Sequence, residues 1–178
     1  EISACLVGSE MCIRDSPKSV GNGETFPRNL ITQEEVRRGV ALLADQVAVR
    51  LRRHRMKATT LQVTIRDPNF KDICRQRPLP APTCTARELM RAALEIIGCG
   101  GEADAPIRAI TLTAQNLIPE DEATEQLGLF APEEPHRRDK AEKLERVVDR
   151  LRERYGHDAV TPAVLVPAPG TEENDVPF

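Results

Sequence analysis

The amino-acid sequence predicts an α+β fold of the split βαβ type, with two helices on one face of a four-stranded antiparallel sheet. Segments with apolar residues at every second position alternate with segments whose apolar residues recur every three or four positions. Their order is strand, helix, strand, strand, helix, strand, and a Thr-x-x-Glu sequence precedes each helix. After Pro119 the chain becomes acidic and rich in proline, so we expect the folded domain to span residues 18–119.

The first strand is expected over residues 20–26, ended by Pro27. Thr32 and Glu35 then form a capping-box sequence at the start of the first helix. The apolar stripe of this helix consists of Val36, Val40, Leu43, Val47 and Leu51. Its far end is strongly basic, which either complements the carbonyl end of the helix or faces a phosphate, and both interpretations stay open. The basic residues are Arg50, Arg52, Arg53, Arg55 and Lys57.

A hairpin and a second helix follow. Residues 61–65 alternate apolar and polar, residues 67–69 read as a turn, and a second strand is expected over residues 70–77. The prolines of residues 78–82 cannot donate to a ladder and predict a connection. Thr85 and Glu88 form the second capping-box sequence, Gly98 ends the second helix, and residues 110–115 alternate as the last strand.

The sheet face turned away from the helices is expected to be polar. It should carry Thr60, Gln62, Thr64, Arg66, Arg75, Arg77, Thr111 and Thr113. Hydroxyls and guanidiniums with almost no carboxylate suit a phosphate backbone. Such a face is also stable in water without any ligand, so the pattern alone leaves both possibilities open.

Charge divides the chain in two. Residues 18–119 hold 16 Lys and Arg against 10 Asp and Glu, a balance of +6, whereas residues 120–178 hold 8 against 15, a balance of −7. A basic domain with an acidic tail is typical of nucleic-acid contact by one part only, although a mixed solvated surface is the alternative. The five cysteines form no Cys-x-x-Cys pair, no apolar run could span a membrane, and a single Tyr without Trp argues against base stacking.

The second half predicts a docking peptide within a linker. Residues 120–136 are acidic and proline-rich, yet they contain Gln126, Leu127, Leu129 and Phe130. An exposed apolar cluster costs free energy unless a partner covers it, so this peptide is interpreted as a docking site. A helix is expected over residues 137–156, with Leu144, Val147, Val148 and Leu151 on one stripe, and disorder over residues 157–178. Residues 1–16 lack any periodicity and resemble translated sequencing-adapter read-through, so we interpret the chain as part of a longer protein.

Several of these segments resemble one family. Residues 18–26, Lys-Ser-Val-Gly-Asn-Gly-Glu-Thr-Phe, look like the start of the little-finger domain of Y-family translesion DNA polymerases of the DinB type. Residues 60–80, ending in Arg-Pro-Leu-Pro, are similar to the central hairpin of that domain, and residues 107–117 to its closing strand. Residues 126–130 resemble the pentapeptide by which bacterial polymerases bind the sliding clamp, and residues 152–156 resemble the tail of some DinB polymerases.

The resemblance implies a part that grips primer–template DNA and tethers a polymerase to the bacterial sliding clamp. On matching positions, Ser19 and Gly21 would contact a template phosphate. The sheet contacts would be Thr64, Arg66, Arg75, Arg77, Arg108 and Thr113, and the clamp pocket would receive Gln126, Leu127, Leu129 and Phe130. Ala109 stands where some relatives have a basic residue, which would weaken the contact of the last strand.

No catalytic residue is expected in this chain. Nucleotidyl transfer needs carboxylates that hold two metal ions about 4 Å apart, and the Asp121–Glu122 pair lies in a linker that cannot fix them. Mg²⁺ is therefore expected for the parent polymerase and no cofactor for this part. The alternatives are a catalytically inactive polymerase-like adaptor between DNA and clamp, and a split βαβ module for oligomerisation or RNA. We expect a monomeric, cytoplasmic protein.

Overall fold

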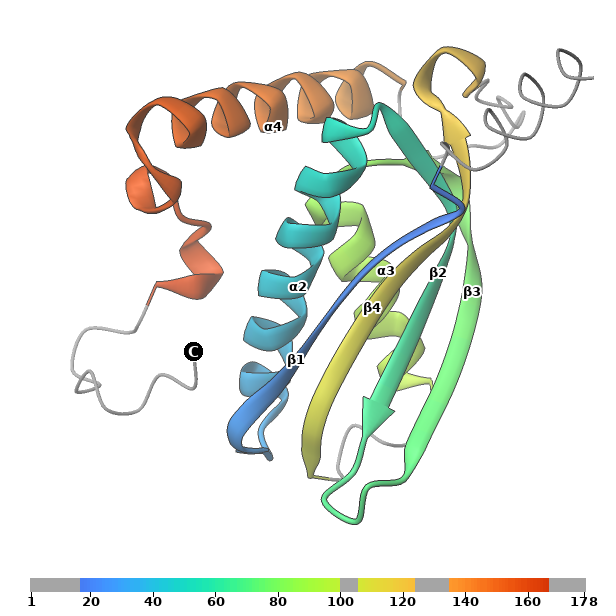
Figure 1. The fold of residues 1–178 in the computed structure, drawn as a ribbon, viewed down its shortest axis with the longest axis vertical. Coiled ribbons are helices and arrows are strands. Elements are labelled where there is room, and N and C mark those ends of the chain that lie inside the picture. Colours follow the sequence, from blue (N-terminus) through green and yellow to red (C-terminus); the bar gives the residue numbers. More distant parts are fainter. Residues whose placement is uncertain (1–16, 100–105, 124–134, 167–178) are drawn as a thin grey trace, which may run out of the picture.

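The computed structural model describes residues 17–99, 106–123 and 135–166. Four strands form one antiparallel sheet in the order β1-β4-β2-β3. They are β1 (Ser19–Leu30), β2 (Met56–Arg66), β3 (Asp72–Thr83) and β4 (Ile107–Pro119). Helices α2 (Gln33–Arg53) and α3 (Ala86–Gly98) both cover the same face, and α4 (Pro135–Tyr155) runs across one end of α2 (Figure 1). The predicted split βαβ fold is confirmed.

The core lies between the two helices and the sheet. The predicted stripe of α2 is buried against the inward residues of the strands, among them Phe26, Leu61 and Leu112. α2 passes closest to β1 at Gly39, where a Cβ atom would lie 2.7 Å from Cζ of Phe26. A glycine at this position therefore lets the helix approach the strand.

The two predicted capping boxes have different outcomes. The Thr32 hydroxyl accepts a hydrogen bond from the Glu35 amide at 3.2 Å, and the Glu35 carboxylate accepts from the Thr32 amide at 3.0 Å, so the first box is confirmed. Backbone donors of Thr32 and Ile31 hold the pKa of Glu35 below its usual value. The second box is wrong, because the Thr85 hydroxyl donates to the Glu88 carboxylate and caps no amide.

A carboxylate from α4 takes the place of the second cap. The first amide of α3, that of Ala86, donates to Glu145 at 3.0 Å. A negative group at a helix N-terminus satisfies an amide donor and complements the helix dipole. The sequence around residue 85 could not show this, because the acceptor lies 59 residues away along the chain.

Prolines do not end the strands where the sequence predicted. β1 continues past Pro27 to Leu30, with an irregular register between Thr25 and Leu30. β3 continues through residues 78–82 to Thr83, so the predicted connection is part of a strand. β3 is an edge strand, and a proline there can turn its missing donor away from the neighbouring strand.

The predicted C-terminal helix is present as α4, and its charged side faces the domain. The buried Arg52 guanidinium donates to both carboxylate oxygens of Asp149, at 2.6 and 2.8 Å, to Glu145, and to the Cys84 carbonyl at 3.0 Å. The apolar stripe faces outward instead, with Leu144 63% exposed. Among the side chains of α4 that the structure describes, only that of Arg152 is buried. Ion pairs therefore attach this helix.

Two further pairs act in the same interface, Lys57 with Glu142 at 2.7 Å and Arg152 with Asp45 at 2.8 Å. Arg152 also donates to the Val160 carbonyl at 2.9 Å, which orders the chain after α4. Residues 157–166 contain the short 3-10 helices η3 (His157–Ala159) and η4 (Ala163–Leu165), so the predicted disorder does not hold there. No described helix is long and apolar enough to span a membrane.

Candidate nucleic-acid interface

The strand registers assemble four rows of side chains on the sheet face turned away from α2 and α3, which we name the open face. Residues paired across antiparallel strands point to the same side of a sheet. The rows, each from β1 through β4 and β2 to β3, are Ser19–Gln115–Thr60–Pro78, Gly21–Thr113–Gln62–Gln76, Gly23–Thr111–Thr64–Cys74 and Thr25–Ala109–Arg66–Asp72. The surface is thus dominated by hydroxyls, amides and glycines, with one cation and one anion.

Two glycines of β1 leave room on this face for the threonine side chains of β4. A Cβ atom on Gly21 would lie 2.9 Å from the Thr113 hydroxyl oxygen, and one on Gly23 would lie 2.4 Å from that of Thr111. The two threonine hydroxyls therefore lean over the glycines, where any larger residue would displace them. The glycines therefore let the two hydroxyls lie against the backbone of β1, on the surface that a nucleic acid would meet.

The cation of the open face is partly occupied. Arg66 donates from Nε and Nη2 to the two carboxylate oxygens of Asp72, at 2.6 and 2.8 Å. This bidentate pair raises the pKa of Arg66 and lowers that of Asp72, so both groups stay charged at neutral pH. The pair with Asp72 leaves three N–H groups of Arg66, two on Nη1 and one on Nη2, for further acceptors.

The amides of the face bond to one another. Gln115 donates to the Gln62 side chain at 2.5 Å, and Asn116 donates to the Thr60 hydroxyl at 3.0 Å. These bonds join β4 to β2 through their side chains and hold donors and acceptors in fixed positions on the surface.

The expected placement of Arg75 and Arg77 on this face is wrong. Arg77 pairs with Leu61 and Arg75 with Val63, and both partners point into the core, so the two arginines lie on the helix side of the edge strand. Arg77 bonds Glu95 of α3 at 2.8 Å, which confirms this side. The sequence could not reveal this placement, because the two-residue period alone does not say which alternate positions of β3 face inward.

Arg108 and the basic end of α2 also lie away from the rows. Arg108 sits beyond the last row and donates to the Pro27 carbonyl at 3.0 Å. Arg50 donates to the Gly21 carbonyl at 2.8 Å, and Arg52 pairs with α4. Arg50 and Arg52 of the basic cluster therefore stabilise the tertiary structure, a role that neither interpretation of the sequence proposed.

The structure brings Ser19, Gly21, Thr64, Arg66 and Thr113 of the expected contacts together. Sequence reasoning missed Gly23 and Asp72, which the cross-strand register alone places on the face. Gln126, Leu127, Leu129 and Phe130 lie outside the described residues. Among the described residues, no group of three or more His, Cys, Asp or Glu side chains is arranged to hold a metal ion.

A model of the impB/mucB/samB family C-terminal domain matches residues 17–129. The chain belongs to this family. The match confirms the resemblance to Y-family polymerases and covers every strand of the sheet. DNA polymerase IV of Acetivibrio thermocellus is 35% identical over 149 residues, covering 84% of this chain and 37% of that protein. DNA polymerase IV of Oceanobacillus iheyensis is 31% identical over 144 residues, covering 81% of this chain and 33% of that protein.

The chain therefore spans well under half the length of these family members. A solved complex of the beta-clamp processivity factor and the little finger domain of PolIV is also similar, at 16% identity and a TM-score of 0.48. That match covers 64% of this chain and 99% of the solved chain.

Proposed function

We propose that this chain is the DNA-gripping, clamp-tethering C-terminal part of a translesion DNA polymerase that works in the cytoplasm. The observation that carries the proposal is the open face, where rows of hydroxyls and amides include Thr111 and Thr113, packed over the glycines of β1. Donors of this kind hold phosphates without reading base sequence. Such a grip suits an enzyme that must accept damaged templates, and the family relatives are named DNA polymerase IV.

The proposed contacts are Ser19, Gly21, Thr64, Arg66 and Thr113, supplemented by Gly23 and Gln62 of the same rows. Arg75, Arg77 and Arg108 are left out, because their side chains lie off the open face or bond elsewhere. In this proposal residues 18–119 form the DNA-binding domain, residues 120–136 the linker with the clamp peptide, and residues 137–156 the C-terminal helix. Carboxylates and Mg²⁺ for nucleotidyl transfer would belong to the remainder of the parent protein.

The charge of the open face predicts how strongly DNA binding should depend on salt concentration. Its four rows hold one arginine, already paired with Asp72. A protein that neutralises one or two phosphates shows a slope of log K against log salt of about −1 to −2. Binding through this face should therefore weaken only gently with salt.

The test is fluorescence anisotropy of the full chain with primer–template DNA over a salt series. Thr113→Glu places a carboxylate in the second row and should weaken binding at least about tenfold, because a like charge then faces the phosphates. Arg77→Glu, on the helix side of the sheet, is the control and should leave affinity nearly unchanged. A large loss in Arg77→Glu with none in Thr113→Glu would assign DNA binding to another surface.

Clamp binding rests on the peptide of residues 126–130, whose apolar side chains are anchors of the kind that fill a hydrophobic pocket. We expect Leu129→Ala with Phe130→Ala to abolish binding to a bacterial sliding clamp in surface plasmon resonance and to leave DNA affinity intact. Unchanged clamp affinity in the double variant would remove this part of the proposal. The alternative is a catalytically inactive adaptor between DNA and clamp. The rest of the parent protein distinguishes the two functions, because in an adaptor it would lack the catalytic carboxylates.

A further inference from the structure

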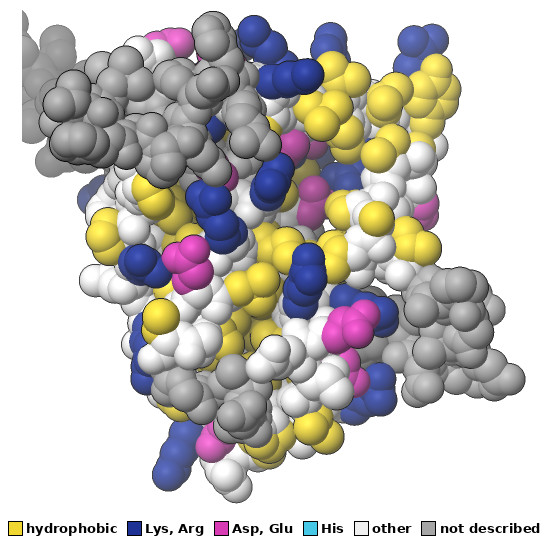
Figure 2. All heavy atoms as spheres, turned by 180° about the vertical axis from the view of Figure 1, so that it is seen from behind, with side chains coloured by type: hydrophobic (Ala, Val, Ile, Leu, Met, Phe, Trp, Pro, Cys, Tyr) yellow, Lys and Arg dark blue, Asp and Glu magenta, His cyan; other side chains and the backbone are white. Residues whose placement is uncertain are grey.

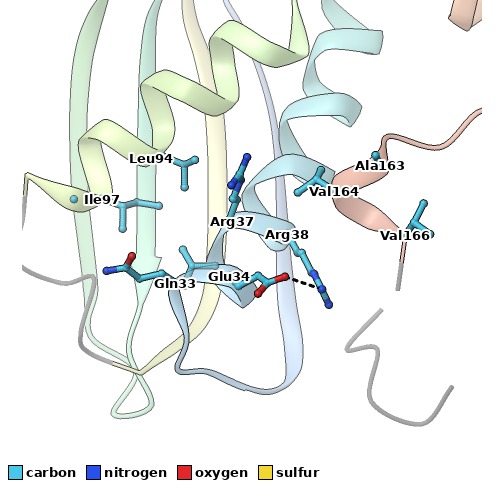
Figure 3. A pocket seen from close by; sticks show the side chains of 11 residues that line it. Gln33, Glu34, Arg37, Arg38, Leu94, Ile97, Ala163, Val164 and Val166 are labelled. Atoms are coloured by element: carbon cyan, nitrogen blue, oxygen red, sulfur yellow. Dashed lines mark hydrogen bonds and ion pairs between the residues drawn. The ribbon is translucent and has the colours of Figure 1, made fainter. Parts of the chain in front are cut away.

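A groove runs between α2 and α3 on their outer side, with the sheet behind it (Figure 3). Two hollows of about 670 and 520 Å³ share Arg37 and Leu94 as lining residues and are therefore adjacent. The floor is apolar and includes Val36, Leu94 and Ile97. This surface lies on the side opposite to the open face and takes no part in the proposed DNA contact.

The rim of the groove carries unbalanced positive charge. Arg37 and Arg87 are exposed and have no partner among the described residues. The nearby acidic groups are engaged, since Glu34 bonds Arg38 at 2.9 Å and Glu95 bonds Arg77 at 2.8 Å. Figure 2 shows this helix-covered side, where Lys and Arg side chains stand among exposed apolar ones and Asp and Glu are fewer.

The chain itself leads into the groove. After α4 the segment turns back along α2, and Ala163, Val164 and Val166 form one wall of the larger hollow (Figure 3). Twelve residues follow, Pro-Ala-Pro-Gly-Thr-Glu-Glu-Asn-Asp-Val-Pro-Phe. They contain three carboxylates, Glu172, Glu173 and Asp175, followed by the apolar residues Val176 and Phe178. The segment thus carries negative charge that complements the arginines of the rim, and apolar side chains that match the apolar floor.

We propose that residues 167–178 bind in the groove between α2 and α3. The carboxylates would pair with Arg37 and Arg87, and the apolar residues would cover Leu94 and Met90, which line the smaller hollow. Twelve extended residues reach about 40 Å, about twice the length of α3, so the tail can span the groove from Val166. Its attachment at the rim raises its local concentration, which favours this occupant over a free peptide.

Zero-length carbodiimide cross-linking of the full chain tests the proposal, since it joins a carboxylate only to an amine that already touches it. Arg37→Lys and Arg87→Lys each introduce such an amine in the groove. Arg53→Lys is the matched control, because Arg53 is exposed on the same helix as Arg37 and lies outside both hollows. We expect amide links from residue 37 or 87 to residues 172–175, at least about tenfold more abundant than from residue 53.

The links should form within one chain at any protein concentration and decrease as salt screens the charges. In a chain with Glu172→Gln, Glu173→Gln and Asp175→Asn, a fluorophore at residue 178 should become more mobile in anisotropy decay than in the wild-type tail. Equal yields from residue 53 would overturn the proposal. So would links found only between two chains, which would assign the groove to a second copy.

Discussion

Replacement of Arg52 by methionine should release α4 from the domain. Methionine keeps much of the aliphatic stem and removes the guanidinium, which makes four hydrogen bonds with Asp149, Glu145 and the Cys84 carbonyl. Desolvation lowers the pKa of Arg52, but the bond to Asp149 and the charge of Glu145 more than compensate and raise it, so the group is charged at neutral pH. Burial raises the pKa of Glu145, and the guanidinium opposes that rise.

The magnitude follows from what the two carboxylates can do once they are alone. Removal of one partner of a buried ion pair costs about 3–5 kcal/mol when the other stays buried. The side chains of Asp149 and Glu145 are 19% and 21% exposed, so both can regain water if α4 moves away. We therefore expect a loss near the lower end, about 3 kcal/mol in the opening free energy of α4, or about 100-fold faster amide exchange.

Hydrogen exchange of the α4 peptides, read by mass spectrometry, measures this loss. Arg53→Met is the control, because that neighbouring side chain is exposed and should change exchange little. A cycle that combines Arg52→Met with Asp149→Asn should be strongly non-additive, since each change removes the same contacts. Equal exchange of α4 in the Arg52 and Arg53 variants would refute the view that ion pairs attach this helix.

Glycine substitutions in α2 and α3 and the reactivity of Cys84 test the packing of the domain. Gly39→Ala should lower the free energy of unfolding by about 1–2 kcal/mol in urea titration, because the overlap with Phe26 outweighs the helix propensity of alanine; Gly98→Ala, with nothing within 4 Å of the added atom, should be neutral or stabilising. Burial raises the pKa of the Cys84 thiol to about 12, so an alkylating reagent at pH 8 should spare it while the exposed described cysteines react. The unfolded thiol ionises near its ordinary value of 9.0, so stability should fall as pH rises from 9 towards 12, whereas rapid alkylation of native Cys84 would contradict its burial.

Local patterns predicted the elements well. Apolar residues at every second position identified β2 and β4, and apolar residues at every third or fourth position identified α2 and α3. Thr32 with Glu35 correctly marked the N-cap of α2. These signals depend on neighbours within a turn or a strand, which the sequence contains in full. The predictions that prolines end β1 and β3 were wrong because they depend on information outside the local sequence. Whether a proline ends a strand depends on whether that strand lies at the edge of the sheet, which the local sequence does not state.

The sequence did not show which face of β3 or of α4 points toward the domain. In β3 the charged Arg75 and Arg77 share a face with Ile73 and Leu79, so hydrophobic alternation did not identify the inward side. In α4 the apolar stripe indicated the helix but not its orientation, and Glu142, Glu145 and Asp149 face the domain. The helix meets the domain at a cluster of cations, and carboxylates are the side chains that satisfy a buried guanidinium there.

The placement of Arg75 and Arg77 on the helix side changes the charge of the candidate interface. The sequence placed three arginines of the β2–β3 hairpin on one face, which would make a strongly basic surface with steeply salt-dependent binding. The register leaves Arg66 alone there and sets Asp72 beside it, while Arg50 and Arg52 of α2 bond to Gly21 and to α4. A nucleic acid on this face would therefore be held mainly by neutral donors, among them the hydroxyls of Thr111 and Thr113 that lie over Gly23 and Gly21. Binding of this kind depends on shape, and a Cβ atom at either glycine should disturb it as much as the loss of a charge.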